Sequence, residues 1–230
     1  MGVSENLTAV RERINSSAVK AGRNPEDIKL VAVTKTVGLP EIVEAVKAGV
    51  TILGENKVKE ARDKISNFKF QISNLKVEWH LIGSLQTNKA KTALQLFDLI
   101  HSVDSISLAE GINRQAQKLD KRQRVLIEVK LSEEETKQGV SEVELMPLLE
   151  TVKDMDHLKL EGLMTIPPYF EDPEKARPYF RRLRDLRDEA VQKGFDLPEL
   201  SMGMSNDFEV AIEEGATMVR IGTAIFGERK

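Results

Sequence analysis

The amino-acid sequence predicts a single (β/α)8 barrel, and three observations lead to that prediction. Short apolar or β-branched runs alternate regularly with longer segments of helical spacing along the 230 residues. Eight such runs occur, enough to close a parallel sheet through right-handed crossovers and leave no exposed edge. The rival architecture is an open doubly wound sheet, but no G-x-G-x-x-G motif or Walker A loop follows any run, and no shift in composition marks a second domain. We therefore expect one domain over residues 1–230.

The expected elements follow one another at regular intervals. Strands are expected at 30–34, 50–53, 78–82, 99–103, 124–129, 159–164, 199–202 and 218–221. Helices are expected between them at 39–48, 57–65, 88–97, 105–119, 141–151, 174–193 and 206–214. Gly49, Gly194 and Gly215 stand where the C-terminus of a helix favours glycine, and Gly22 ends a further amphipathic helix at 4–21 that precedes the first strand.

Composition and charge exclude several classes of protein. With 34 Lys and Arg against 37 Asp and Glu, the net charge of −3 provides no long-range field that would attract nucleic acid. The absence of cysteine excludes a disulfide framework, a thiol nucleophile and a Cys-ligated metal, and it fits a reducing, cytoplasmic compartment. The first twenty residues lack an apolar block of signal-peptide length, and no stretch approaches the roughly 18 apolar residues that span a bilayer. We expect a cytoplasmic protein that binds neither nucleic acid nor membrane.

The three histidines give no metal-binding pattern. His80, His101 and His157 are far apart in the sequence and do not form a His-x-x-His or His-Glu-x-x-His motif. We therefore expect no metal site, and we interpret His80 as a partly buried histidine whose hydrogen bonds are satisfied.

The residues that directly follow each strand are the candidates for a binding site, because ligands of such barrels bind at the carboxyl ends of the strands. The first strand runs into Lys35, which places an amine at an apolar barrel mouth. Partial desolvation lowers the pKa of a lysine amine and makes it a candidate for Schiff-base chemistry. On position alone, the alternative is that Lys35 extends its amine into solvent.

A phosphate site is expected after the last two strands. Arg220 lies near the end of the eighth strand, where a buried guanidinium needs an acceptor, and Gly222 and Thr223 offer backbone N–H groups and a hydroxyl. Ser205 follows the seventh strand, and we expect it to be the N-cap of the next helix. The loops after strands seven and eight form the recurrent phosphate site of such barrels. The alternative is that Ser205 only caps a helix and that the glycines only form turns.

Seven sequence blocks, in order along the whole chain, resemble the signature of the pyridoxal phosphate homeostasis proteins. The blocks are VAVTK at 31–35, GEN at 54–56, WHLIG at 79–83, LQTNK at 85–89, GLMTI at 162–166, MGMS at 202–205 and VRIGTAIFG at 219–227. That family is a single barrel, similar to the N-terminal domain of alanine racemase, which holds pyridoxal 5′-phosphate (PLP) on a lysine. Two departures, Ser84 and the Pro167-Pro168 loop, lie beside the site and remove no proposed ligand.

The resemblance implies a role for each candidate residue. Lys35 would form the Schiff base, and Arg220 would face the pyridine nitrogen. The phosphate would be held by Ser205, Gly222 and Thr223, and the ring would be enclosed by Asn56, Ile82 and Met204.

The leading hypothesis is a monomeric PLP-binding protein that buffers or delivers the cofactor, with PLP-dependent apo-enzymes as possible recipients and with no catalytic residue of its own. A PLP-dependent racemase-like enzyme is the alternative, and a barrel with a sugar-phosphate substrate is a third. Racemisation needs a second base, which in alanine racemase is a tyrosine from another domain. We expect no such domain with the barrel of residues 1–230, and of its tyrosines we expect only Tyr169 to reach the mouth.

Overall fold

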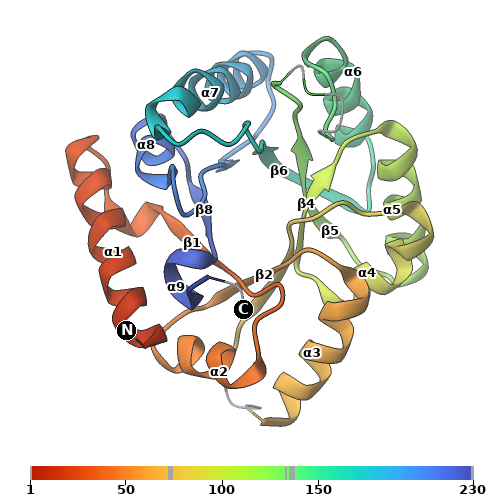
Figure 1. The fold of residues 1–230 in the computed structure, drawn as a ribbon. Coiled ribbons are helices and arrows are strands. Elements are labelled where there is room, and N and C mark those ends of the chain that lie inside the picture. Colours follow the sequence, from red (N-terminus) through yellow and green to blue (C-terminus); the bar gives the residue numbers. More distant parts are fainter. Residues whose placement is uncertain (1, 72–74, 133, 135–137, 229–230) are drawn as a thin grey trace.

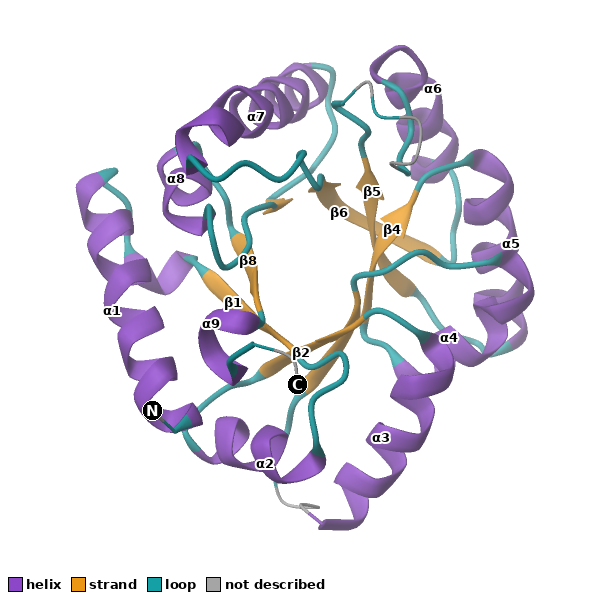
Figure 2. Ribbon diagram, viewed as in Figure 1, coloured by secondary structure: helices purple, strands orange, loops and turns teal. Residues whose placement is uncertain are grey.

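The protein is a closed barrel of eight parallel strands surrounded by helices (Figures 1 and 2). The structure is a computed structural model that describes residues 2–71, 75–132, 134 and 138–228. Each strand pairs with its sequence neighbours, and β8 pairs with β1, so that Val31 lies opposite Arg220 and Ala32 opposite Ile221. The predicted (β/α)8 barrel is confirmed.

The strands lie close to the positions that the sequence predicts. They are β1 (Lys29–Val33), β2 (Ile52–Glu55), β3 (Glu78–Leu81), β4 (Leu99–Val103), β5 (Gln123–Glu128), β6 (Leu158–Met164), β7 (Glu199–Ser201) and β8 (Met218–Ile221). The largest difference is β2, which was expected at 50–53. Val50 donates its N–H to the carbonyl of Ala45 and so completes the end of the preceding helix instead of joining the sheet.

The helices are α1 (Val3–Lys20), α2 (Leu39–Lys47), α3 (Val58–Gln71), α4 (Ala90–Leu96), α5 (Ile106–Lys118), α6 (Glu142–Lys153), α7 (Arg177–Gln192), α8 (Phe208–Glu213) and α9 (Thr223–Phe226). Short 3₁₀ turns lie at η1 (Pro25–Asp27), η2 (Thr87–Lys89) and η3 (Pro173–Ala176). The helix expected at 174–193 is divided, because Asp172 caps the turn η3 and α7 begins only after it. Gly22, Gly49, Gly194 and Gly215 have positive φ at helix ends, as predicted.

The N-terminal helix α1 takes the outer position that an eighth full-length helix would occupy. The helix that follows β8, α9, has four residues, whereas α1 packs along α8, α9 and α2. Figure 1 shows α1 outside β1 and β8. Its buried apolar face recurs every three to four residues, at Val3, Leu7, Val10, Ile14 and Ala18.

Alternation along the strands separates two apolar regions. The larger one fills the space between the sheet and the surrounding helices. The smaller one lies inside the barrel and consists of Val31, Val33, Ile82, Leu99, Leu126, Met164 and Met218. Because side chains fill the barrel interior, the strands that carry the residues of the mouth are held in fixed positions relative to one another.

Within the described ranges, no helix combines the length and apolar character needed to cross a membrane. The same residues contain no group of three or more His, Asp or Glu side chains placed to hold a metal ion.

Phe208 provides a test of how α1 and α8 pack. Its ring is fully buried, and the Arg13 guanidinium of α1 lies 4.6 Å from the ring centroid. We expect Phe208→Ala to lower the free energy of unfolding by about 3–5 kcal/mol, because it opens a cavity under α1. Urea denaturation measures this loss, with Val143→Ala as the control, since Val143 is 86% exposed on α6 and should change stability by less than about 0.5 kcal/mol. A loss below about 1 kcal/mol in Phe208→Ala would contradict the packing.

Candidate functional site

All eight residues that the sequence predicts for the site line one cavity of about 630 Å³ at the carboxyl ends of the strands. They are Lys35, Asn56, Ile82, Met204, Ser205, Arg220, Gly222 and Thr223. The loops after β1, β2, β3, β7 and β8 therefore meet at one place. The cavity lies in the size range of small-molecule binding sites.

Lys35 lies on a turn of unusual backbone conformation. It follows β1 by two residues and is half-buried at the cavity. The next residue, Thr36, has a φ of 63°, a left-handed conformation that is costly for a β-branched side chain. The N–H of Thr36 donates to Glu60 Oε1 of α3 at 2.7 Å, which holds the turn in place.

A buried ion pair supports this turn from below. Lys64 Nζ donates to the Thr34 carbonyl at 2.6 Å, to Glu55 Oε1 at 2.7 Å and to Glu60 Oε1 at 3.0 Å. Thr34 also donates its hydroxyl to Glu55 Oε1. Burial raises the pKa of Glu55, while the hydrogen bonds from Lys64 and Thr34 oppose that rise. The Glu55 Oε2 atom is buried and has no hydrogen-bond partner among the residues that the structure describes, so this carboxylate depends on Lys64 for its charge compensation.

We use the name anion cradle for Ser205, Gly222, Thr223 and Ala224, which lie next to the end of β1, where the loops after β7 and β8 meet. Ser205 Oγ accepts hydrogen bonds from the N–H groups of Gly222 and Ala224, each at 3.3 Å, so its own proton is free to be donated elsewhere. The prediction that Ser205 caps the following helix is wrong. Asp207 is the N-cap of α8, and its Oδ1 accepts the N–H of Met204 at 2.6 Å. That carboxylate fixes the loop, and the Ser205 hydroxyl is left to contact the start of α9.

Arg220 brings a buried positive charge to the base of the cavity. It is 3% exposed, and its guanidinium donates to Ser201 Oγ at 2.6 Å and to the Thr165 carbonyl at 2.9 Å. Burial lowers the pKa of Arg220 to about 10, and the charges of Glu128 and Asp207 oppose that shift. Arg220 therefore remains protonated at neutral pH and can only donate hydrogen bonds.

Part of the remaining wall is formed by apolar side chains and by backbone. Val33, Ile82 and Ile166 line the cavity beside Met204. Gly83 permits the loops after β2 and β3 to approach closely, because a Cβ at this position would lie 2.5 Å from the carbonyl oxygen of Asn56.

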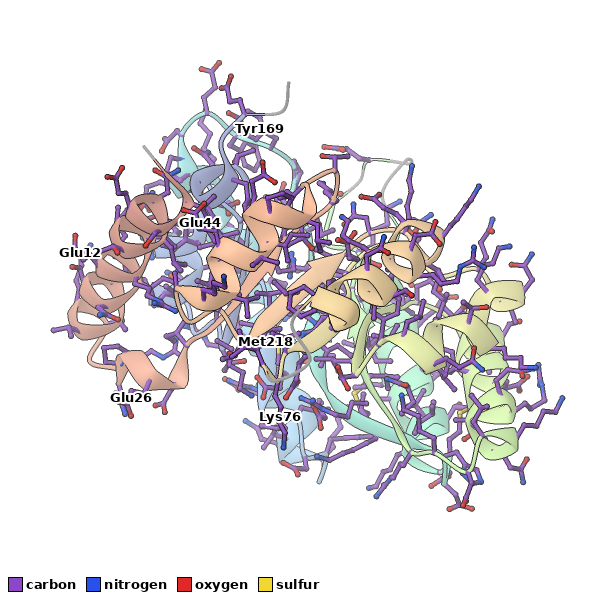
Figure 3. The ribbon with its side chains drawn as sticks, turned by 90° about the horizontal axis from the view of Figure 1, so that it is seen from below. Glu12, Glu26, Glu44, Lys76, Tyr169 and Met218 are labelled. Atoms are coloured by element: carbon purple, nitrogen blue, oxygen red, sulfur yellow. The ribbon has the colours of Figure 1, made fainter. Side chains whose placement is uncertain are left out.

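Tyr169 stands at the rim and is 75% exposed, and Figure 3 shows it at one end of the molecule, far from Lys76 and Met218.

Several residues that shape the site were not predicted from the sequence. Ser201 and Thr165 hold Arg220, and Asp207 fixes the Ser205 loop. The alternation of β7 could have indicated that Ser201 points inward, because Leu200 packs against the helices on the other face. No sequence pattern pairs Ser201 with Arg220, since they lie on two different strands.

The fold and the site define an α/β-barrel protein with a lysine, a buried guanidinium and an anion cradle at its mouth. The family model "Alanine racemase, N-terminal domain" matches residues 6–230. A pyridoxal phosphate homeostasis protein of Aquifex aeolicus (strain VF5) is 50% identical over 232 residues, which cover 100% of both chains. One of Escherichia coli (strain K12) is 40% identical over 233 residues, covering 99% of this chain and 97% of the relative.

A solved structure agrees with these relatives. PipY of Synechococcus elongatus PCC7942, determined with PLP bound, superposes with a TM-score of 0.85 at 35% identity, covering 98% of this chain and 100% of PipY. The chain belongs to the family of the pyridoxal phosphate homeostasis proteins, whose barrel is of the alanine racemase N-terminal type. The resemblance noted in the sequence is confirmed.

Lys64 gives a test of the support beneath Lys35. Lys64→Met leaves the buried Glu55 carboxylate without its cation, so we expect the free energy of unfolding to fall by about 3–5 kcal/mol at pH 8. Without Lys64 the pKa of Glu55 rises further above its unfolded value, and a raised acid pKa costs stability as the pH increases. The loss should therefore be smaller at pH 5 than at pH 8.

Urea denaturation at both pH values measures this difference. Lys59→Met is the matched control, because Lys59 is an exposed lysine of the same helix. A loss that is equal at the two pH values would contradict the role assigned to the Glu55–Lys64 pair.

Proposed function

We propose that this chain binds PLP covalently through Lys35 and buffers or delivers it, with little or no catalytic turnover. The supporting observation is that one cavity presents three groups that are complementary to the aldehyde, the pyridine nitrogen and the phosphate of PLP. Lys35 offers an amine, Arg220 a buried guanidinium, and the loops after β7 and β8 an anion cradle. Relatives at 50% and 40% identity carry the name pyridoxal phosphate homeostasis protein, and PipY was solved with PLP bound.

The residues present fit the cofactor. The N–H groups of Gly222 and Ala224 already converge on one oxygen, Ser205 Oγ, and a phosphate oxygen offers them a stronger, charged acceptor. The hydroxyls of Ser205 and Thr223 would donate to the same phosphate. The apolar side chains of Val33, Ile82 and Met204 would enclose the ring, with Asn56 beside them.

PLP supplies an aldehyde that condenses with amines and a ring that withdraws electrons from an attached carbon. Arg220 limits the second property. A guanidinium that can only donate leaves the pyridine nitrogen without a proton of its own, which makes the ring a poor electron sink. The site would therefore hold the aldehyde and discourage carbanion chemistry.

The positions of the two tyrosines also favour a protein that holds the cofactor over a racemase. Both lie in the described part of the chain, and of the two only Tyr169 lines the cavity, where it is largely exposed at the rim. Tyr179 lies on α7 and packs against Phe170. Without a second general base in position, racemisation would be slower by about 10²–10⁴-fold.

We propose a cytoplasmic monomer whose recipients are PLP-dependent apo-enzymes. One chain supplies each of the eight proposed ligands, so cofactor binding requires no second copy. A protein that holds a reactive aldehyde on a lysine can release it to another amine without free PLP accumulating.

The covalent link is tested by reduction. Protein incubated with PLP should turn yellow, and after borohydride treatment a pyridoxyl group should be found on the peptide that contains Lys35. Lys35→Ala should lose the label while binding PLP weakly through the phosphate. Lys57→Ala is the matched control, because Lys57 lines the same cavity and should label normally. A label on Lys57, Lys89 or another lysine, or a colourless protein that binds sugar phosphates, would refute the proposal.

The phosphate cradle is tested by comparing two ligands. Each charge-assisted hydrogen bond contributes about 1.5–3 kcal/mol, so Ser205→Ala and Thr223→Ala should each weaken PLP retention by about tenfold or more. Binding of pyridoxal, which has no phosphate, should change little. Dialysis followed by absorption spectroscopy measures both. Equal losses for the two ligands would show that these residues only shape the loops.

A further inference from the structure

A continuous chain of hydrogen bonds runs through the barrel interior from Arg220 to Glu78. Arg220 Nη1 contacts Ser201 Oγ at 2.6 Å, and Ser201 Oγ contacts His101 Nδ1 at 2.9 Å. His101 Nε2 then contacts His80 Nδ1 at 3.0 Å, and His80 Nε2 contacts Glu78 Oε2 at 3.2 Å. Ser201, His101 and His80 are fully buried, whereas the Glu78 side chain is 48% exposed. The chain therefore links β8, β7, β4 and β3 across the barrel.

The chemistry of the two ends fixes the direction of every bond. Glu78 is an ionised acceptor, because hydrogen bonds from His80 and Arg124 lower its pKa to about 2. His80 must donate from Nε2, which leaves Nδ1 as an acceptor for His101 Nε2–H. His101 Nδ1 in turn accepts the Ser201 hydroxyl proton, and Ser201 Oγ accepts from Arg220. Each group thus donates one hydrogen bond toward Glu78, and every bond of the chain has one donor proton and one acceptor.

Both imidazoles are neutral in this arrangement. Burial lowers the pKa of His80, and burial together with the positive charges of Arg220 and Arg124 lowers the pKa of His101 well below its ordinary value. The charged groups that face His80 are Glu78, Arg124 and Asp98, and those that face His101 are Arg220 and Arg124. Neutral imidazoles with one donor and one acceptor are what the directed chain requires.

The two ends of the chain open at opposite ends of the barrel. Arg220 lines the cavity at the mouth, while Glu78 and His80 line a second cavity of about 900 Å³ where the strands begin. Met218 and Lys76 also line this second cavity, and Figure 3 shows both at the end away from Tyr169. The carboxylate of Glu78 is anchored there by Arg124 at 2.8 Å.

We propose that Ser201, His101 and His80 are positioning residues that orient the Arg220 guanidinium and transmit to it the negative polarisation of Glu78. This inference rests on the proposed function, because it assigns a purpose to Arg220 at the cofactor ring. Successive hydrogen bonds of one direction polarise one another, so Ser201 Oγ is a stronger acceptor than an isolated hydroxyl. The guanidinium is thereby held in one plane at the base of the cavity.

The direction of the chain is tested without cofactor. In ¹⁵N-histidine-labelled apoprotein at pH 7, NMR should show His80 and His101 as neutral tautomers protonated on Nε2, with His157 identified by its disappearance in His157→Gln. Ser201→Ala should shift the His101 Nδ1 resonance, since that nitrogen loses its donor. A proton on Nδ1 of either buried histidine, or an imidazolium, would overturn the assignment.

The effect on Arg220 is tested with PLP labelled at the pyridine nitrogen. Ser201→Ala and His101→Leu should shift the ring-nitrogen resonance and release PLP about tenfold faster, whereas Ser201→Thr, which keeps the hydroxyl, should restore both. His101→Gln, whose amide can both accept and donate, should lie between them and serves if His101→Leu does not fold.

The control is Thr217→Val, which removes a hydroxyl that contacts Glu199 and Leu200 of β7 but takes no part in the hydrogen-bond chain from Arg220 to Glu78. An unchanged nitrogen resonance and release rate in Ser201→Ala, with Lys35 still labelled, would refute this inference alone. Loss of labelling in the unaltered protein would instead refute the proposed function and leave the apoprotein test standing.

Discussion

The burial of one positive charge, Arg220, is the constraint on which the arrangement of the mouth depends. A guanidinium that is almost fully enclosed must have acceptors in fixed positions, and here they come from Ser201 on β7 and from the Thr165 carbonyl after β6. Because β8 pairs with β1, the same strand that carries Arg220 also lies beside the strand that leads to Lys35. The closed sheet thus places the guanidinium on one strand and the amine on the turn that directly follows the neighbouring strand.

Each chemical group at the mouth is supported by a layer beneath it. Lys64 and Glu60 hold the turn that carries Lys35, Asp207 holds the loop that carries Ser205, and His101 contacts Ser201 beneath Arg220. These supports are themselves buried or anchored to helices. A site intended to hold an aldehyde for long periods benefits from such rigidity, because ordered ligands lose less conformational entropy on binding.

Five of the candidate residues could be predicted from their position, because each follows or nearly ends an apolar strand and the ends of parallel strands converge at one mouth. They are Lys35, Ser205, Arg220, Gly222 and Thr223, whereas Asn56, Ile82 and Met204 came only from the family resemblance. The supports could not be predicted in the same way. Ser205 has the spacing of a cap for α8, but Asp207 takes that position, and the Ser205 hydroxyl instead accepts hydrogen bonds from Gly222 and Ala224 at the start of α9. His80 was expected to be partly buried with satisfied hydrogen bonds; both ring nitrogens have partners, but the side chain is fully buried. Its partner His101 lies 21 residues away on the next strand, and Ser201, the other partner of His101, lies 100 residues further. Contacts across a barrel interior depend on closure and register, which periodicity does not encode.

The central claim is that the site holds PLP and does not use it for catalysis. Solvent-deuterium exchange at Cα of alanine, serine and glutamate by the PLP-loaded protein tests this claim most directly. The proposed contact of Arg220 with the ring nitrogen, which would leave that nitrogen unprotonated, and the exposed position of Tyr169 predict exchange far slower than about 1 s⁻¹, the lower end of ordinary enzyme turnover. Steady exchange above that rate, abolished in Tyr169→Phe, would contradict the account and identify a racemase-like enzyme with Tyr169 as its second base.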